Sequence, residues 1–340
     1  MLPKVLASSI IRTSQENEVH GYLYLIDLEN ETIVKTLQWN DSDISFNGRG
    51  GQRGLRGIAF YNEHIYIGSG FKLLEFDKNL ELINTYTNEY LDDIHEMEVH
   101  NEQLYLVSSG YDAVLEFDLA SKSFVKGYAI DSLRMQYKKN IIYRFLNKYY
   151  LNPLFVFRKR TNYKLNIFDP NKTKQIKGTS NKANRIHINT ISFDKDALCM
   201  SGTLSNFQFK IVNNQLELNA VIPLVTHNVL NFDDKHIIYN STKKEELIIA
   251  SKTGTVKKRF KGISFNEDNL EYIPDQKEKA VAGWGRGLCW TEDKNIIISG
   301  TSPATIMVYD NTKNKMIKSF QISKDIRNAI HGLEIFPYTL

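Results

Sequence analysis

Short apolar runs separated by polar turns follow one another along the whole chain, with the spacing of strands. Runs rich in Ile, Val, Tyr and Phe, such as residues 65–70 and 73–77, end at Gly, Asn, Asp or Lys. This pattern is typical of short β-strands joined by tight turns. Four such runs occupy one unit, and the series then begins again after about 40 to 45 residues. Four short strands in each repeated unit predict the blades of a β-propeller.

The first strand of each predicted blade begins with a guanidinium or imidazole side chain. These six leader residues are Arg56, His95, His187, His227, Arg286 and His331. The first strand of a blade runs along the central axis, so residues at its start gather at one mouth of the central channel. The repeat therefore predicts a ring of four histidines and two arginines at that mouth.

The two ends of the chain are complementary. Residues 5–9, 22–27 and 32–39 resemble the second, third and fourth strands of a blade, whereas residues 331–336 resemble a first strand with almost nothing after it. A blade shared between both ends would leave neither terminus as an unpaired sheet edge. The sequence therefore predicts an all-β fold, a six-bladed β-propeller that forms one domain over residues 1–340 and closes through a shared blade.

One interval, from His95 to His187, is too long for a single blade. Residues 131–164 are interpreted as an insertion with helix-like stretches, because they lack strand alternation. The alternative is a seventh blade, which the strand-like residues 163–169 favour. The insertion carries nine basic and eight aromatic residues. A lid over the channel mouth is the preferred interpretation, a peripheral membrane contact is the alternative, and a nucleic-acid partner is not expected.

The histidines of the ring indicate a metal site. Neutral imidazoles are the commonest ligands of transition metals, so the ring predicts bound Fe, Mn, Cu or Zn. The predicted ligands are His95, His187, His227 and His331. Glu96, Glu98 and Glu334 lie close to leader residues and are candidate hydrogen-bond partners of the imidazoles. The alternative is that each histidine satisfies backbone groups of the neighbouring blade without binding metal.

Other polar residues at the same mouth indicate a ligand. Arg56 and Arg286 offer planar forks to a carboxylate or phosphate, and Asn189 and Asn228 are further candidates for substrate binding. The predicted function is binding, with metal-assisted conversion left open, of a small anionic or amphiphilic molecule. The pattern assigns no catalytic residue and does not distinguish an oxygenase from a lyase or a hydrolase. The alternative is a non-catalytic scaffold for protein–protein interaction.

Composition narrows these predictions only slightly. The 340 residues carry a net charge of +4, which alone indicates no polyanionic partner. No apolar stretch reaches the roughly 18 residues of a membrane span. Cys199 and Cys289 lie inside predicted strands without metal-site spacing, so they are expected to be buried thiols of a cytoplasmic protein. No nucleotide-cofactor motif is present, and none of that cofactor class is expected.

The repeat resembles those of known propeller groups. The four-strand units and the inner-strand starts are similar to six-bladed propellers of the strictosidine-synthase-like, gluconolactonase-like and virginiamycin-lyase-like group. The histidine set resembles in kind the four-histidine iron centre of the seven-bladed carotenoid-cleavage oxygenases. Residues 286–290, 302–305 and 328–334 resemble a bacterial propeller family of unsettled function. These resemblances imply the fold and a site on the axis, and they assign no catalytic residue.

Overall fold

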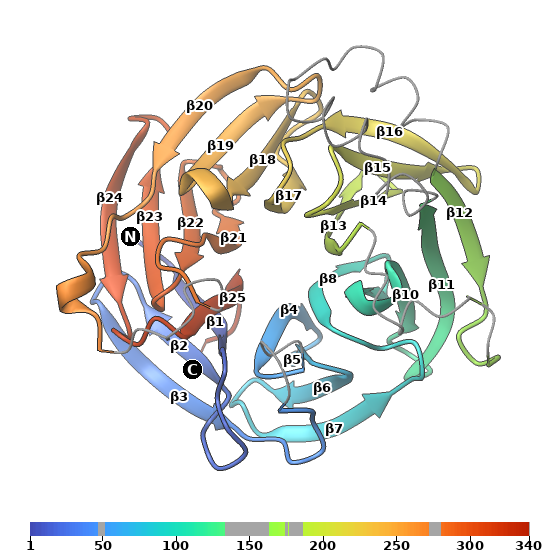
Figure 1. Ribbon diagram of the computed structural model, residues 1–340, viewed down its shortest axis with the longest axis horizontal. Helices are drawn as coiled ribbons and strands as arrows, with labels where there is room; N and C mark the ends of the chain where they lie inside the picture. The colour runs from blue at the N-terminus through green and yellow to red at the C-terminus, as the bar shows by residue number, and fades with distance from the viewer. Residues whose placement is uncertain (47–51, 133–162, 174–175, 177–185, 272–279, 340) are drawn as a thin grey trace, which may run out of the picture.

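Six antiparallel sheets form a ring around a central axis (Figure 1). The computed structural model describes residues 1–46, 52–132, 163–173, 176, 186–271 and 280–339. The described residues confirm the predicted six-bladed β-propeller. The innermost strands of the blades, which surround the axis in Figure 1, are β25, β4, β8, β13, β17 and β21.

The strand bounds follow the predicted units closely. Blade 1 contains β1 (Lys4–Ile11), β2 (Gly21–Asp27), β3 (Thr32–Trp39) and β25 (Asn328–Ile335), and blade 2 contains β4 (Leu55–Tyr61), β5 (His64–Ser69), β6 (Lys72–Asp77) and β7 (Leu82–Thr87). Blade 3 contains β8 (Ile94–His100), β9 (Gln103–Ser108), β10 (Ala113–Asp118), β11 (Ser123–Ser132) and β12 (Tyr163–Phe168), and blade 4 contains β13 (Ile188–Asp194), β14 (Ala197–Gly202), β15 (Phe207–Val212) and β16 (Gln215–Val221). Blade 5 contains β17 (Thr226–Asn231), β18 (His236–Ser241), β19 (Glu246–Ser251) and β20 (Val256–Lys261), and blade 6 contains β21 (Arg286–Trp290), β22 (Ile296–Thr301), β23 (Thr305–Asp310) and β24 (Lys315–Gln321). Single 3-10 turns occur at η1 (Ser109–Tyr111), η3 (Thr242–Lys244) and η4 (Glu267–Asn269).

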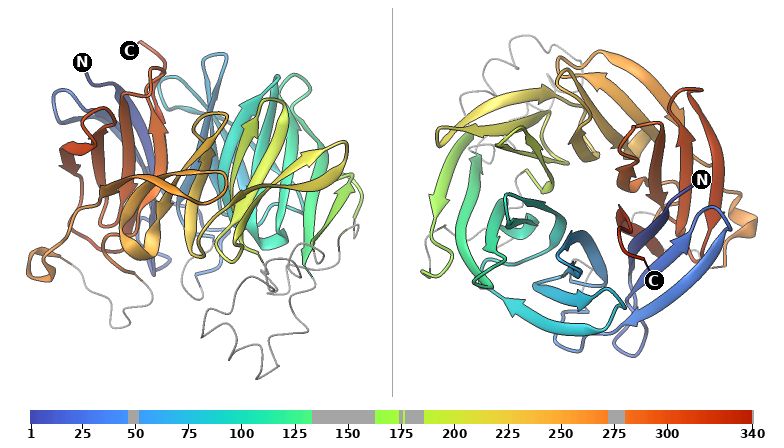
Figure 2. Two further views of the ribbon diagram at one scale, coloured as in Figure 1. Left: turned by 90° about the horizontal axis from the view of Figure 1, so that it is seen from above. Right: turned by 180° about the vertical axis from the view of Figure 1, so that it is seen from behind.

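Blade 1 closes the ring as predicted. The last strand, β25, pairs antiparallel with β1, and Val5 lies opposite Ile335. The backbone N–H of Phe336 also donates to the carbonyl of Lys4 at 3.0 Å. The edge-on view in Figure 2 accordingly shows both chain ends on one face of the disc. Neither terminus leaves an open inner edge.

Blade 3 has a fifth strand where a seventh blade was the alternative. β12 pairs antiparallel with the outer edge of β11, with Gly127 opposite Phe168. A Cβ atom on Gly127 would lie 2.2 Å from the Phe168 ring, so glycine lets the ring cross the sheet here. The seventh-blade alternative is therefore wrong. The ends of the predicted insertion, residues 131–132 and 163–164, are paired strand positions, and its helix-like stretch lies outside the described residues.

The apolar core of the described residues is divided into six layers, one between each pair of neighbouring blades. Successive residues of a strand point to opposite faces of the sheet, so they enter different layers. In β1, Val5 and Ala7 pack toward blade 6, whereas Leu6 packs toward blade 2. This explains why the second and third strands read as nearly continuous apolar runs.

Glycines bring the inner strands close together at the axis. A Cβ atom on Gly57 would lie 2.4 Å from the carbonyl oxygen of His95 in the next blade. A Cβ atom on Gly332 would lie 2.3 Å from the carbonyl oxygen of Arg56. These glycines each follow a leader residue, so the sequence places its smallest residue where neighbouring blades approach most closely.

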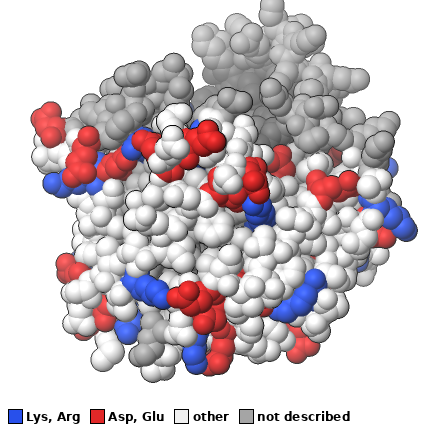
Figure 3. All heavy atoms as spheres, turned by 90° about the horizontal axis from the view of Figure 1, so that it is seen from below, with Lys and Arg blue, Asp and Glu red and all other residues white. Residues whose placement is uncertain are grey.

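The outer surface is polar and mixed in charge. The outermost strands β3 and β7 are largely exposed, and Figure 3 shows acidic and basic residues interspersed on the side of the molecule that it depicts. No helix of the described residues is long and apolar enough to cross a membrane. Cys199 and Cys289 are buried and free, as predicted.

Candidate functional site

The leader residues gather around the axis, and four of them are buried. Each lies within, or directly before, the inner strand of its blade. The exposed fractions are 3% for Arg56, 2% for His95, 5% for His227 and 2% for His331, while His187 and Arg286 keep partial exposure. The side chains of these residues therefore pack mainly against protein. This differs from the solvated channel mouth that the sequence indicates.

Three of the histidines lie in contact. The ring centroid of His95 is 5.0 Å from that of His187 and 5.0 Å from that of His331. His331 Nε2 accepts a hydrogen bond from Arg286 Nη1 at 2.7 Å. His227 instead pairs through Nδ1 with Thr242 Oγ1 at 2.8 Å, and its buried Nε2 has no hydrogen-bond partner in the described part of the chain.

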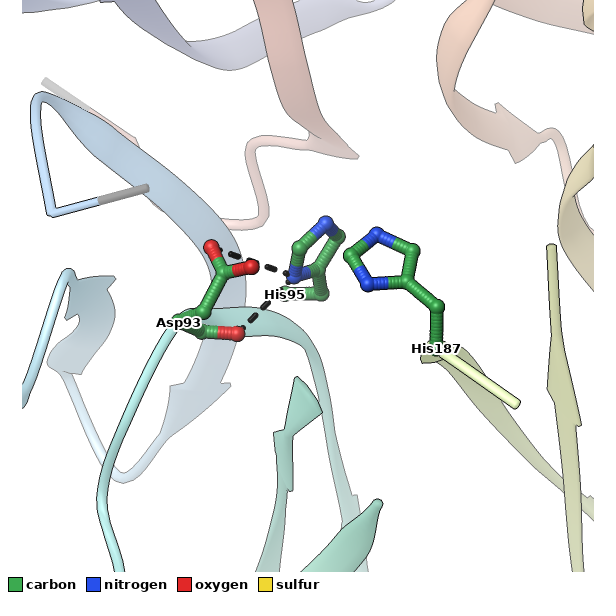
Figure 4. A group of neighbouring side chains, drawn as sticks. All are labelled: Asp93, His95 and His187. Carbon is green, nitrogen blue, oxygen red and sulfur yellow. Dashed lines mark hydrogen bonds and ion pairs between the residues drawn. The ribbon is translucent and has the colours of Figure 1, made fainter. Parts of the chain in front are cut away.

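Within the described residues, one group of His, Cys, Asp and Glu side chains is close enough to share an ion. It contains Asp93, His95 and His187, whose ligand atoms all lie within 4.8 Å of one another (Figure 4). Asp93 was not predicted from the sequence. It lies two residues before a leader histidine, and that spacing is the signal that would have found it. His227 and His331 do not join this group.

Asp93 is held as a carboxylate by its neighbours. Its side chain pairs with the guanidinium of Arg56. Burial alone would raise the pKa of Asp93, but the charge of the Arg56 guanidinium and its hydrogen bond act in the opposite direction, and the pKa falls to about 2. Asp93 is therefore ionised at neutral pH, and Arg56 is engaged with it.

The buried imidazoles are held in the neutral form. Burial lowers the pKa of His95, His227 and His331 well below its usual range, and Arg286 lowers all three further. The Nδ1 atom of His95 lies 2.9 Å from the carbonyl oxygen of Asp93 and 2.8 Å from Ser109 Oγ. The Ser109 hydroxyl donates to the carbonyl of Ile188, so Nδ1 of His95 carries the imidazole hydrogen. The carbonyl and Ser109 thus orient His95, in place of the expected glutamates.

The two predicted asparagines have different surroundings. Asn189 Nδ2 donates to Thr203 Oγ1 at 2.8 Å and to the carbonyl of Thr226 at 3.2 Å, which links blades 4 and 5. Asn228 Nδ2 donates across the axis to Glu96 Oε1 at 2.7 Å. Asn228 therefore connects blade 5 to blade 3 through the channel, whereas Asn189 serves an interface between blades.

A cavity of about 390 Å³ lies beside the residues that follow the leader residues along the same inner strands. We call this cavity the chamber. Its wall includes the aromatic residues Phe60, Phe193 and Trp290 and the acidic residues Glu96, Glu98 and Glu334. The inner strands end beyond it, on the face that carries both chain ends. The sequence signal for the chamber was an acidic residue inside an otherwise apolar inner strand.

The chamber carboxyl groups bind protons more tightly than usual. Each keeps part of its surface exposed to the cavity, yet protein atoms surround it on most sides. Burial raises the pKa of Glu98 to about 7. Burial also raises the pKa of Glu96 to about 8, although Asn228 and Arg286 act in the opposite direction. The pKa of Glu334 rises well above its usual range through burial and the other two glutamates.

Comparisons with known proteins define the class of protein and no narrower family. No protein-family model matches the chain, and no curated protein matches it. Among solved structures, the chain is similar to the WD40 β-propeller domain of Doa1, with a TM-score of 0.51 and 9% identity over 94% of this chain and 79% of that one. It is also similar to a protein of unknown function from Bacteroides caccae, with a TM-score of 0.53 and 7% identity over 98% of each chain.

At such low identity these likenesses show the fold alone. The protein is therefore an all-β, six-bladed propeller with a polar ring and a chamber on its axis. The resemblance to the strictosidine-synthase-like, gluconolactonase-like and virginiamycin-lyase-like group stays a prediction, as does the likeness to carotenoid-cleavage oxygenases.

Proposed function

We propose that this propeller binds a small amphiphilic molecule in the axial chamber. The observation that carries the proposal is a cavity of about 390 Å³ whose wall combines aromatic and acidic residues. Sites for small molecules are concave, mostly apolar, and hold a few polar groups that orient the ligand. Phe60, Phe193 and Trp290 supply the apolar surface, and the three glutamates supply the polar groups.

The chemistry of the wall favours a ligand whose polar end donates hydrogen bonds. Carboxylate oxygens accept hydrogen bonds, and aromatic faces attract cations. An amine on an apolar chain has both properties. The expectation of an anionic ligand rested on Arg56 and Arg286, which do not line the chamber. Arg56 pairs with Asp93, and Arg286 donates to His331, so the proposal keeps the amphiphilic character of the predicted ligand and gives it an N–H donor.

Binding is proposed without conversion of the ligand. Cys289 is also a wall residue of the chamber, and burial raises the pKa of its thiol well above the usual range. A thiol in that state is a poor nucleophile, since the thiolate is the reactive form. A role as a scaffold for protein partners stays the alternative prediction.

Isothermal titration of the full chain with three matched probes tests the proposal. Hexylammonium, hexanol and hexanoate share the apolar chain and differ in the polar end. We expect hexylammonium to bind most tightly and hexanoate most weakly at pH 8. Glu98→Gln should weaken hexylammonium binding about tenfold or more, because it removes a charge-assisted hydrogen bond.

A control variant and a pH series sharpen the result. Glu217→Gln changes an acidic residue whose side chain is 50% exposed on the outer strand β16, outside the chamber, and should leave the affinity unchanged. Because the pKa of Glu98 is about 7, hexylammonium affinity should rise from pH 6 to pH 8.5 as this carboxyl loses its proton. Equal binding of the three probes, or equal loss in both variants, would refute the proposal.

A further inference from the structure

Asp93, His95 and His187 bring the donor set of a transition-metal site together at the junction of blades 3 and 4. Asp93 lies just before β8, His95 is the second residue of β8, and His187 directly precedes β13. Their ligand atoms lie within 4.8 Å of one another, and Figure 4 shows the three side chains grouped together. Two imidazoles and one carboxylate form the set that binds divalent iron and related ions, and three protein ligands leave coordination positions open.

The backbone at two of these residues adopts the sparsely populated left-handed region. Asp93 has φ 53° and His187 has φ 55°. Asp93 occupies the place that Gly54 occupies in blade 2, two residues before the leader, where φ is 75°. Glycine adopts this conformation without steric cost, whereas a residue with a side chain does so at a cost. Val225 adopts φ 62° at the same position of blade 5, so blades 2, 3 and 5 share this conformation, and in blade 3 it presents a carboxylate beside the leader histidine.

An independent observation at the neighbouring His331 points to a missing group. Arg286 can only donate, so Nε2 of His331 accepts and the imidazole hydrogen lies on Nδ1. That Nδ1 atom is buried, has no hydrogen-bond partner in the described residues, and belongs to a ring 5.0 Å from His95. A buried donor without a partner indicates an acceptor, such as a water molecule or an anion, that completes its hydrogen bonding.

We propose that Asp93, His95 and His187 bind one divalent transition-metal ion such as Fe²⁺, Mn²⁺, Co²⁺ or Zn²⁺, and that His227 and His331 are not ligands. The ligand atoms must move closer together, since ligands at about 2.0–2.2 Å from an ion lie within roughly 3.5 Å of each other. Arg56 opposes this movement because it pairs with the Asp93 carboxylate. A water or anion on the bound ion would accept the hydrogen of His331 Nδ1. The site is separate from the chamber, whose wall includes none of the three ligands.

Titration with Co²⁺ tests the site. The full chain is purified without a histidine tag, treated with a chelator and titrated while the visible absorption of Co²⁺ is recorded. We expect one ion per chain. His187→Ala and Asp93→Asn should each weaken Co²⁺ binding at least about 100-fold. Arg56→Gln should strengthen it, because it releases the carboxylate of Asp93.

The matched control is His236→Ala, which removes a partly exposed histidine paired with Asp233 at 2.9 Å. This variant should bind Co²⁺ as the parent does. Circular dichroism and thermal melting check that each variant is folded, and Asp93→Asn keeps the test decisive if His187→Ala fails to fold. The proposal would be overturned if the parent bound no Co²⁺. It would also be overturned if His236→Ala abolished Co²⁺ binding while Asp93→Asn left it intact.

A separate titration keeps this proposal distinct from the proposed function. His187→Ala should bind hexylammonium as the parent does, because His187 does not line the chamber. A protein that binds Co²⁺ but not hexylammonium would retain the metal site and refute the chamber. The reverse result would refute the metal site alone.

Discussion

The same six inner strands build two regions of opposite chemistry, the ring of leader residues and the chamber beyond it. Guanidinium and imidazole side chains occupy the ring, whereas carboxyl groups and aromatic rings line the chamber. Burial favours the neutral form in both, because it lowers the pKa of the histidines and raises that of the glutamates. The ring is packed against protein, whereas the chamber has space for a ligand. Repetition of one residue type around an axis therefore does not by itself locate the ligand cavity.

Removal of residues 331–340 should have the largest effect, because it breaks both regions. The truncation deletes most of β25, which pairs with β1 and contributes His331 to the ring and Glu334 to the chamber. We expect no cooperative thermal transition and loss of folded protein. A truncated chain that melts near the parent temperature would contradict the closed ring of blades.

Gly57→Ala should damage the ring more than the chamber. The added Cβ atom would meet the backbone of His95 at 2.4 Å, so two inner strands must separate. Overpacking of this kind costs about 1–3 kcal/mol of unfolding free energy. Urea denaturation measures this loss. An unchanged midpoint would show that the inner strands of blades 2 and 3 leave room for a methyl group at residue 57.

The dependence of thermal stability on pH should reflect the titration of the carboxyl groups in the chamber. Glu96, Glu98 and Glu334 face one another there and have raised pKa values in the folded protein. The stabilising contribution of Glu96 and Glu98 is fully present below the unfolded pKa of about 4.5 and is lost as pH rises through their folded pKa values of about 7 to 8. The ring histidines, whose lowered pKa values act in the opposite direction, do so below their unfolded pKa of about 6.5. The midpoint of thermal melting should therefore decline between about pH 7 and pH 8.

The decline should be smaller in Glu98→Gln, which lacks one of the titrating groups. Glu217→Gln, on an outer strand, should keep the full decline. The same decline in the parent and in both variants would show that the chamber does not cause it.

Replacement of residues 134–161 by a short Gly-Ser link should have the smallest effect on both regions. The flanking strands already pair, with Ser132 opposite Tyr163, so a short turn can join them. Loop length changes the free energy of closure by only about 1 kcal/mol or less. Thermal melting should give a midpoint close to that of the parent, and a collapsed fold would show that the segment is part of the core.

The same variant tests the predicted lid and membrane contact of residues 131–164. If the segment is a lid, hexylammonium should bind more weakly after the replacement. If the segment contacts a membrane, the parent should sediment with anionic vesicles at low salt and the variant should not. Parent-like behaviour in both assays would leave the segment as a surface loop.

The blade repeat and the closure could be predicted from the sequence because both depend on local strand patterns. The leader residues marked the inner strands correctly, and residues 331–336 marked the shared blade. The fifth strand of blade 3 was harder to assign, since its place beside β11 depends on a pairing across residues 133–162. A strand pattern alone does not say which edge the strand joins.

The site was less accessible to sequence reasoning because it depends on contacts between blades. The partners of His95 and His227 are the carbonyl of Asp93, Ser109 and Thr242, none of which has a distinctive sequence pattern. Glu98 and Glu334 were noticed only as neighbours of histidines. Their place in one cavity follows from the ring geometry, which brings positions far apart in the chain onto one axis.

A crystal structure of the full chain soaked with hexylammonium at pH 8 tests the central claim most directly. The account predicts density for the probe inside the chamber, with its nitrogen beside a glutamate and its chain against Phe60, Phe193 or Trp290. An empty chamber at saturating probe, or a probe bound at the leader residues instead, would contradict it.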